Sequence, residues 1–112
     1  MLLYCILGEG SAVIVLEELS SATSRGAQIL AEVTGYGASA DAHHITTPSG
    51  DGAVRCMTAA LHDAALSPMD VGYINAHATS TPSGDITELM AINQVFANDG
   101  GHKVSVSATK AA

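Results

Sequence analysis

Apolar residues occur along the chain in short continuous runs and in helical stripes, separated by polar stretches rich in glycine, serine and threonine. Short apolar runs are typical of buried strands, whereas apolar residues three and four positions apart are typical of an amphipathic helix. The pattern predicts the elements strand 11–17, strand 29–36, helix 53–65, strand 71–76, helix 85–96 and strand 103–107. Strands that alternate with helices indicate a layered α/β fold with some parallel strands.

The ends of the helices carry their own signals. Ser67 is a typical N-cap and Pro68 a typical first helical residue, so a new helical turn is expected there. Asp85 is predicted to cap the second long helix, and Glu88 follows it at capping-box spacing. A shorter helical turn is expected over residues 20–26, with a serine at its start and a glycine at its end.

The number of strands exceeds what two helices can cover. Parallel sheets normally carry helices on both faces, so one face would be bare in a chain of this kind. We therefore expect residues 1–112 to be part of one larger α/β domain, without an internal boundary. Alone, such a piece would expose apolar surface and unpaired strand edges, which predicts poor solubility or a loosely packed state.

Charge excludes two classes of partner. The formal net charge is −7, and Arg25, Arg55, Lys103 and Lys110 are the only basic residues. Nucleic acids need clustered cations and membrane surfaces need a basic amphipathic face, so neither is expected to bind. The apolar residues 1–7 are too short to span a bilayer and lack the basic start of a secretory signal, so we expect no targeting segment here.

Cysteines and histidines give no clear metal site. Cys5 and Cys56 are the only cysteines and follow no metal-ligand spacing, so two free thiols in a reducing compartment are expected. The adjacent His43 and His44 have no third ligand at a helpful spacing, and no metal is expected. A small metal-binding module stays an alternative, built from His43, His44, His62 or His102.

Two candidate chemical groups follow two predicted strands. His77 comes directly after strand 71–76 and Lys110 after strand 103–107. Ligands of α/β sheets lie outside the carboxyl ends of strands, so both groups should reach one edge of the sheet. A histidine can donate a hydrogen bond to a developing negative charge, and a lysine can stabilise it by its positive field. A hydrogen-bonded polar histidine and a solvated lysine are the plain alternatives.

Residues 75–85, NAHATSTPSGD, resemble the motif N-A-H-[GA]-T-S-T-P-x-G-D of β-ketoacyl-[acyl carrier protein] synthases of the KAS I/II type. Three further stretches resemble family motifs in the expected order and spacing, with Ala108 where serine is usual. They are GEG at 8–10, AEVTGYGASADAHHIT at 31–46 and SVSATK at 105–110. Residues 1–7 and 111–112 do not fit the family.

The resemblance implies a fold and a reaction. The family has the thiolase-like layered fold of two α/β halves, and this chain would span their junction. The family enzymes are acyltransferases, usually homodimers, that condense acyl groups with malonyl-acyl carrier protein, with loss of CO₂, in fatty-acid biosynthesis. Acyl carrier protein is the implied partner. No cofactor is implied, because the substrates are carried on the phosphopantetheine of that protein.

The resemblance also implies roles for five residues. His77 would donate a hydrogen bond to the malonyl thioester carbonyl as negative charge builds there. Lys110 would set the charge and protonation of the family's pair of histidines. Glu88 matches a supporting carboxylate near that lysine, and Thr79 and Thr81 match residues that contact the phosphopantetheine arm.

The chain departs from the family in two ways. The second catalytic histidine would follow Lys110, and the nucleophilic cysteine would precede Gly8; Cys5 lacks its surrounding motif. We therefore expect an internal fragment that is inactive alone. A non-enzymatic product or pseudo-enzyme, and a piece of a polyketide ketosynthase, stay as alternatives.

Two features resemble mitochondrial members of the family. Ala78 replaces the glycine that is common in bacterial members, and Arg-Cys-Met stands at 55–57. An intracellular soluble protein of the mitochondrial matrix is the resulting expectation, with cytoplasm and plastid as alternatives.

Overall fold

The computed structural model describes residues 9–97 and 104–111. The chain divides into two compact units, residues 1–32 and residues 33–112. The second unit holds every residue that the sequence singles out for chemistry except Cys5. Cys5 and His102 lie outside the described residues. The expectation of one domain without an internal boundary stays a prediction.

In the first unit, the only helix among the described residues is the short α1, Leu19–Ser24. Its N-cap is Glu18 rather than a serine, and the C-cap is Arg25, followed by Gly26 in the left-handed region at φ 67°. Arg25 forms an ion pair of 2.6 Å with Glu17, which also accepts a hydrogen bond from Ser21. These contacts join the two ends of the helical turn that was predicted over 20–26.

The predicted strands 11–17 and 29–36 are wrong for the chain as described. Both segments lack strand pairing, and the exposed fraction of Val13 is 92% and that of Leu30 is 91%. A strand needs a neighbour for its backbone N–H and C=O groups. No strand among the described residues pairs with either segment, because the described sheet contains only two later strands.

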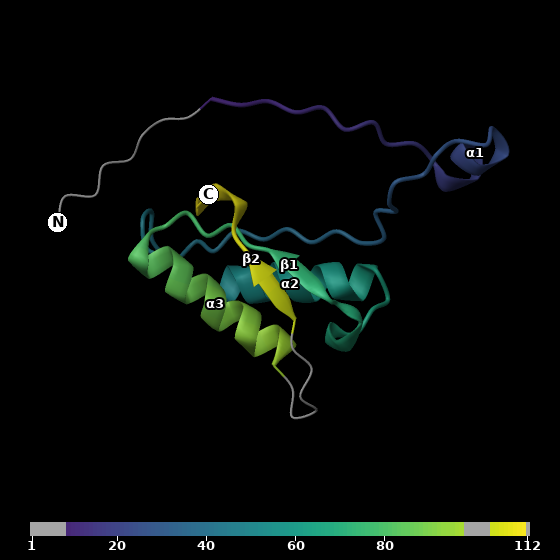
Figure 1. The fold of residues 1–112 in the computed structure, drawn as a ribbon. Coiled ribbons are helices and arrows are strands. Elements are labelled where there is room, and N and C mark those ends of the chain that lie inside the picture. Colours follow the sequence, from purple (N-terminus) through teal and green to yellow (C-terminus); the bar gives the residue numbers. More distant parts are fainter. Residues whose placement is uncertain (1–8, 98–103, 112) are drawn as a thin grey trace. The chain divides into compact units, whose positions relative to one another are not determined.

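The second unit is a small α/β layer (Figure 1). Its elements are, in order, helix α2 (Asp51–Asp63), the 3-10 turn η1 (Pro68–Asp70), strand β1 (Tyr73–Asn75), helix α3 (Pro82–Phe96), strand β2 (Ser105–Ser107) and the 3-10 turn η2 (Thr109–Ala111). Strands β1 and β2 are parallel, with Ile74 opposite Val106. The last two predicted strands are confirmed, both shorter than expected, and so are the two long helices.

Helix ends confirm one capping prediction and correct another. Ser67 and Asp70 form a capping box around η1, with Pro68 at its first position, as predicted. For helix α3 the prediction is wrong, because the N-cap is Thr81 and Asp85 lies inside the first turn. A proline at the first helical position is compatible with an earlier start, since its missing N–H would have no partner there.

The core of this unit is small. Ala76, Ile92 and Phe96 are buried, and side chains of α2, β1 and the chain before β2 pack against them. These partly buried residues are Met57, Leu61, Val71, Ile74, Ala78, Val95 and Val104. Helices α2 and α3 therefore hold the two strands from one side through aliphatic contacts.

The chain before α2 runs close along that helix. A side chain on Gly37 would collide with the carbonyl oxygen of Cys56, so this close approach requires glycine. The backbone N–H of Tyr36 donates to the Asp63 carboxylate at 2.9 Å, and the Ser39 hydroxyl donates to the carbonyl of Gly52 at 2.5 Å. Residues 35–39 are thus fixed by α2 rather than by a sheet.

Candidate functional site

The carboxyl ends of β1 and β2 meet at one edge. The backbone N–H of Ala76 donates to the carbonyl of Ser107 at 2.8 Å, which extends the pairing past the end of β1. The Thr109 hydroxyl donates to the Asn75 side-chain oxygen at 3.5 Å, a weak contact. The segments that carry His77 and Lys110 therefore leave the sheet side by side, as the sequence predicts.

Glu88 of α3 holds the loop that carries His77. Its two carboxylate oxygens accept the backbone N–H groups of His77 and Ala78, each at 2.8 Å. The capping-box prediction for Glu88 is therefore wrong: its carboxylate bonds the amides of His77 and Ala78, which precede the N-cap Thr81 of its helix. Sequence spacing could not reveal this contact, because the two segments meet only through the packing of α3 beside β1.

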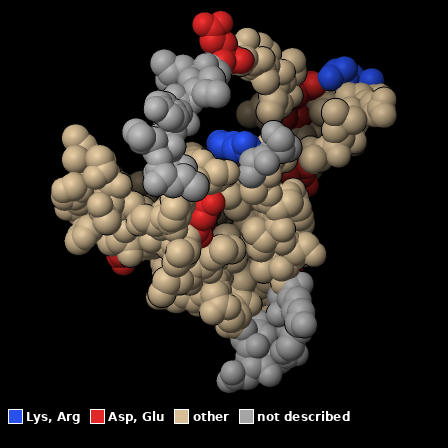
Figure 2. Space-filling view, turned by 60° about the vertical axis from the view of Figure 1, so that its left-hand side comes forward, with Lys and Arg blue, Asp and Glu red and all other residues tan. Residues whose placement is uncertain are grey.

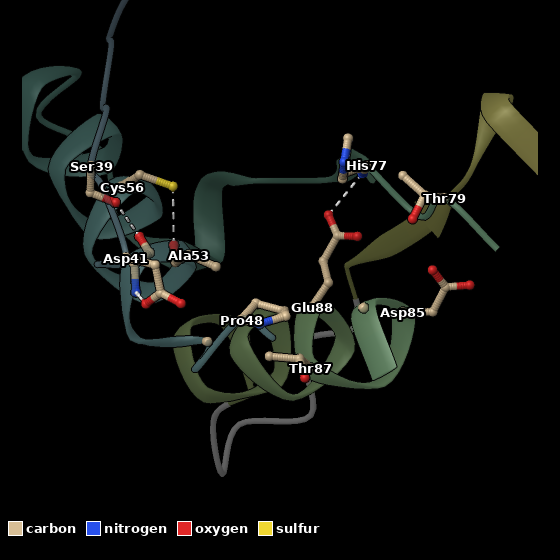
Figure 3. Close-up of a pocket in the computed structure, with 13 residues that line it drawn as sticks. Ser39, Asp41, Pro48, Ala53, Cys56, His77, Thr79, Asp85, Thr87 and Glu88 are labelled. Carbon is tan, nitrogen blue, oxygen red and sulfur yellow. Dashed lines mark hydrogen bonds between the residues drawn. The ribbon is translucent and has the colours of Figure 1, made fainter. Parts of the chain in front are cut away.

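A pocket of about 290 Å³ opens beside this loop (Figure 3). It lies between the chain before α2, the start of α2 and the start of α3. The residues that line it include Ser39, Asp41, Cys56, His77, Thr79 and Glu88. Three of the five predicted site residues, His77, Thr79 and Glu88, therefore line one pocket. Thr81 and Lys110 are not among the residues that line it.

Thr79 and Thr81 are nevertheless close. Their hydroxyl oxygens lie 3.1 Å apart, and either can donate. A side chain on Gly84 would meet the Thr81 hydroxyl oxygen, so a larger residue here would require that hydroxyl to move. In that same turn, one carboxylate oxygen of Asp85 is buried and has no hydrogen-bond partner among the residues that the structure describes.

Asp41 was not singled out as a functional residue, yet it organises one wall of the pocket. Its carboxylate accepts the backbone N–H of Ser49 at 2.6 Å and that of Gly52 at 3.2 Å, and it also bonds the Ser49 hydroxyl. These hydrogen bonds, led by the Ser49 hydroxyl, lower the pKa of the Asp41 carboxyl below its ordinary value. Gly50 at the N-cap has no side chain to cap α2, so Asp41 supplies that group from a distance.

Cys56 is half-buried at the pocket, and its thiol donates to the Ala53 carbonyl at 3.2 Å. Among residues 9–97 and 104–111, no three His, Cys, Asp or Glu side chains gather as metal ligands do. His43, His44 and His62 are within this part, so the alternative of a metal-binding module gains no support from them. His44 instead accepts the backbone N–H of Thr46 at 3.2 Å.

Cations are sparse on the surface. On the face drawn in Figure 2, Lys and Arg form isolated spots on a largely uncharged surface. Arg25 is paired with Glu17, and Arg55 is paired with Asp51 at 2.7 Å. Within the described ranges, no helix combines the length and apolar character needed to cross a membrane.

Residues 30–112 match the family model "Beta-ketoacyl synthase, C-terminal domain". The chain belongs to the β-ketoacyl synthase family. The matched range nearly coincides with the second structural unit, which begins at Val33. The mixed α/β structure is accordingly part of the thiolase-like ketosynthase fold, as the motifs at 75–85 and 105–110 imply.

Two curated relatives of this β-ketoacyl synthase chain are bacterial. It is 50% identical over 107 residues to the 3-oxoacyl-[acyl-carrier-protein] synthase 2 of Staphylococcus aureus, covering 94% of this chain and 26% of that protein. The identity to the protein of the same name from Vibrio harveyi is 47% over 107 residues, with the same coverage. The chain thus spans about a quarter of the length of these relatives.

Solved structures of other ketosynthases have the same fold. A β-ketoacyl synthase from Burkholderia phymatum matches with a TM-score of 0.77 and 39% identity, over 84% of this chain and 22% of that one. A type II polyketide synthase acyl-carrier protein in complex with its ketosynthase matches with a TM-score of 0.76 and 38% identity, over 84% and 23%. The ishigamide ketosynthase/chain length factor matches with a TM-score of 0.75 and 42% identity, over 82% and 22%.

Proposed function

We propose that this chain forms the histidine- and lysine-bearing part of a 3-oxoacyl-[acyl-carrier-protein] synthase. The observation that carries the proposal is the parallel pairing of β1 and β2, which brings the segments after both strands to one edge. One segment carries His77 and the other Lys110. The 50% identity to the Staphylococcus aureus enzyme supports the same reaction class.

In this reaction the C–C bond to the malonyl carboxylate breaks, CO₂ leaves, and the resulting enolate attacks an acyl thioester. The thiolate that carried the acyl group leaves. His77 would donate a hydrogen bond to the thioester oxygen, where negative charge builds during decarboxylation. Lys110 would favour that charge by its positive field, and Thr79 and Thr81 would contact the phosphopantetheine arm.

The nucleophilic cysteine and second histidine of the family do not match residues of this chain. Cys56 lies on helix α2, with its thiol bonded within its own turn. The 112 residues alone are therefore expected to be inactive. No bound cofactor is proposed for the reaction, since the enolate forms by loss of CO₂ from a thioester.

A hybrid enzyme tests the proposal. In this hybrid synthase, the chain replaces the 107 residues of the Staphylococcus aureus synthase that it matches. We expect the hybrid to form 3-oxoacyl product from acyl- and malonyl-acyl carrier protein. His77→Ala should lower kcat roughly 10²- to 10³-fold, as loss of one oxyanion donor does.

Gln94→Ala, a change of an exposed side chain on α3, is the matched control and should retain activity. A folded hybrid without condensation would favour the pseudo-enzyme alternative. Equal activity of the His77→Ala variant would contradict the role of His77.

The structural neighbours favour one second candidate. Three of them are ketosynthases whose descriptions name a polyketide acyl-carrier protein or a chain length factor. A ketosynthase of polyketide assembly would use the same residues on a different acyl chain. The hybrid synthase cannot separate the two, but the full-length protein can: elongation of a saturated acyl primer supports fatty-acid synthesis, and elongation of a poly-β-keto primer supports the second candidate.

Acyl carrier protein is the proposed partner, with a homodimer as the proposed assembly. A neighbouring ketosynthase is described in complex with an acyl-carrier protein, which supports this partner.

A mitochondrial form is the finer proposal on origin. It rests on Ala78 and on Arg-Cys-Met at 55–57, whereas the two curated relatives named above are bacterial. Co-localisation of the full-length protein with a matrix marker would support it, and a cytoplasmic or plastid signal would contradict it.

A further inference from the structure

The turn after β1 has an unusual backbone. Ala78 has a φ of 26°, on the positive side that side chains with a Cβ rarely adopt. Ser80, two residues later, also has a positive φ, of 63°. His77 lies immediately before the first of these residues, so the direction of its side chain depends on whether this turn is kept.

One side chain is bonded to both amides of this turn. Both carboxylate oxygens of Glu88 are used, one on the N–H of His77 and one on the N–H of Ala78, each at 2.8 Å. Figure 3 shows the first of these two hydrogen bonds. Hydrogen bonds from amides to a carboxylate are stronger than those between neutral groups. They can therefore stabilise a turn that alanine would otherwise disfavour.

Glu88 is itself held by a rigid element. It is half-buried on α3, and the next turn of that helix buries Ile92 and Ala91. A carboxylate on a helix that is packed into the core can fix a loop. A carboxylate on a mobile segment would instead move together with the loop. The two bonds thus connect the packing of α3 directly to the position of His77.

We propose that Glu88 is a positioning residue that orients His77 through the backbone of the His77–Ala78 turn. Its effect on the reaction then passes through these two amides and does not depend on the charge of Lys110. This inference rests on the proposed function only for the part that concerns activity. The pair of hydrogen bonds that the His77 and Ala78 amides donate to Glu88, called the clamp below, can be measured separately.

Hydrogen exchange of the hybrid synthase tests the clamp. Glu88→Gln keeps the size of the side chain but replaces one acceptor oxygen by an N–H₂ group, which faces a donor. We expect the amides of His77 and Ala78 to exchange roughly 10- to 100-fold faster, as loss of a hydrogen bond to a charged group predicts. Gln94→Ala on the same helix is the control and should leave both amides unchanged.

Activity of the hybrid synthase tests the orientation. Glu88→Gln should lower kcat, and Ala78→Gly added to it should restore much of the loss, because glycine can adopt a positive φ without strain when the clamp is gone. Ala78→Gly alone should change kcat little. A carboxylate that acted through the charge of Lys110 would not be rescued by glycine at position 78.

The outcomes are separable. Unchanged exchange at both amides in Glu88→Gln would overturn the clamp, and absence of rescue by Ala78→Gly would overturn its role in orienting His77. If the unsubstituted hybrid is inactive, the proposed function fails, but faster exchange in Glu88→Gln would still support the clamp. If Glu88→Gln prevents folding, hydrogen exchange is measured in the Glu88→Asp variant instead. The shorter carboxylate cannot reach both amides, so their exchange should also become faster, and unchanged exchange would overturn the clamp.

Discussion

Two carboxylate side chains, Asp41 and Glu88, each hold a loop of the pocket through backbone N–H groups. Asp41 bonds the amides of Ser49 and Gly52, and Glu88 bonds those of His77 and Ala78. In both cases the acceptor and the donors are 8 to 11 residues apart in the sequence. At the scale of single residues, hydrogen bonds from these amides to two carboxylates therefore help to shape the pocket.

Asp41 predicts a pH dependence with a definite sign. Because its pKa is lowered in the folded state, mainly by the Ser49 hydroxyl, its ionised form stabilises the fold. This contribution is complete above the ordinary Asp pKa of about 3.9 and is lost as the pH falls below it, through the lowered value.

Asp41→Asn should thus lower the thermal midpoint of the hybrid synthase at neutral pH, and the difference from the unsubstituted hybrid should shrink in acid. Thermal midpoints recorded from neutral pH down to about pH 3 check this prediction. Asp51→Asn, which removes an exposed carboxylate that is paired with Arg55, is the control. A difference that stays constant across this range would contradict the argument.

The C-terminal end of helix α2 has alanine at a position whose backbone geometry favours glycine. The chain leaves it through Ala65 at φ 54°, with the N–H of Ala65 bonded to His62 and that of Leu66 bonded to Leu61, at 3.1 and 3.0 Å. This is the hydrogen-bond pattern of a helix end that usually carries glycine, because alanine is strained in the left-handed region.

Ala65→Gly is expected to stabilise the fold by about 1 kcal/mol, since it removes that strain. Ala59→Gly, in an exposed position inside the same helix, is the matched control and should destabilise it by about 1 kcal/mol. The same substitution should thus have opposite signs at two positions of one helix. Thermal midpoints of the two hybrid variants measure this, and a decrease in both would refute the assignment of the left-handed end.

At the scale of the whole molecule, apolar surface is the dominant feature. Residues Val13, Ile14, Val15 and Leu16 are each exposed by 74% or more, and only five apolar residues are buried among those described. Exposed apolar patches of this kind occur at sites that another protein segment covers, or they lead to aggregation.

The isolated 112-residue chain should therefore bind the apolar dye ANS strongly and associate at micromolar concentration. In the hybrid synthase, ANS binding per molecule should be much weaker, because the remaining sequence supplies covering elements. Fluorescence titration and analytical ultracentrifugation check both statements. A monomeric chain that melts cooperatively and does not bind ANS would contradict them.

The sequence by itself determined the elements whose pattern is local. The apolar stripes of α2 and α3, the strands at 73–75 and 105–107, and the Ser67–Asp70 turn follow from spacing and from helix-end residues. Parallel pairing then brings the segments of His77 and Lys110 to one edge, because α/β connections return the chain in the same direction.

Only the tertiary structure decided the partners of groups that are distant in sequence. The carboxylates of Asp41 and Glu88 have no local signal for the amides that they bind, and Glu88 even has the spacing of a different motif. The apolar segment 11–17 has the composition of a strand but no strand partner among the described residues. A strand and a long-range hydrogen bond both require a second segment, and packing alone brings that segment within reach.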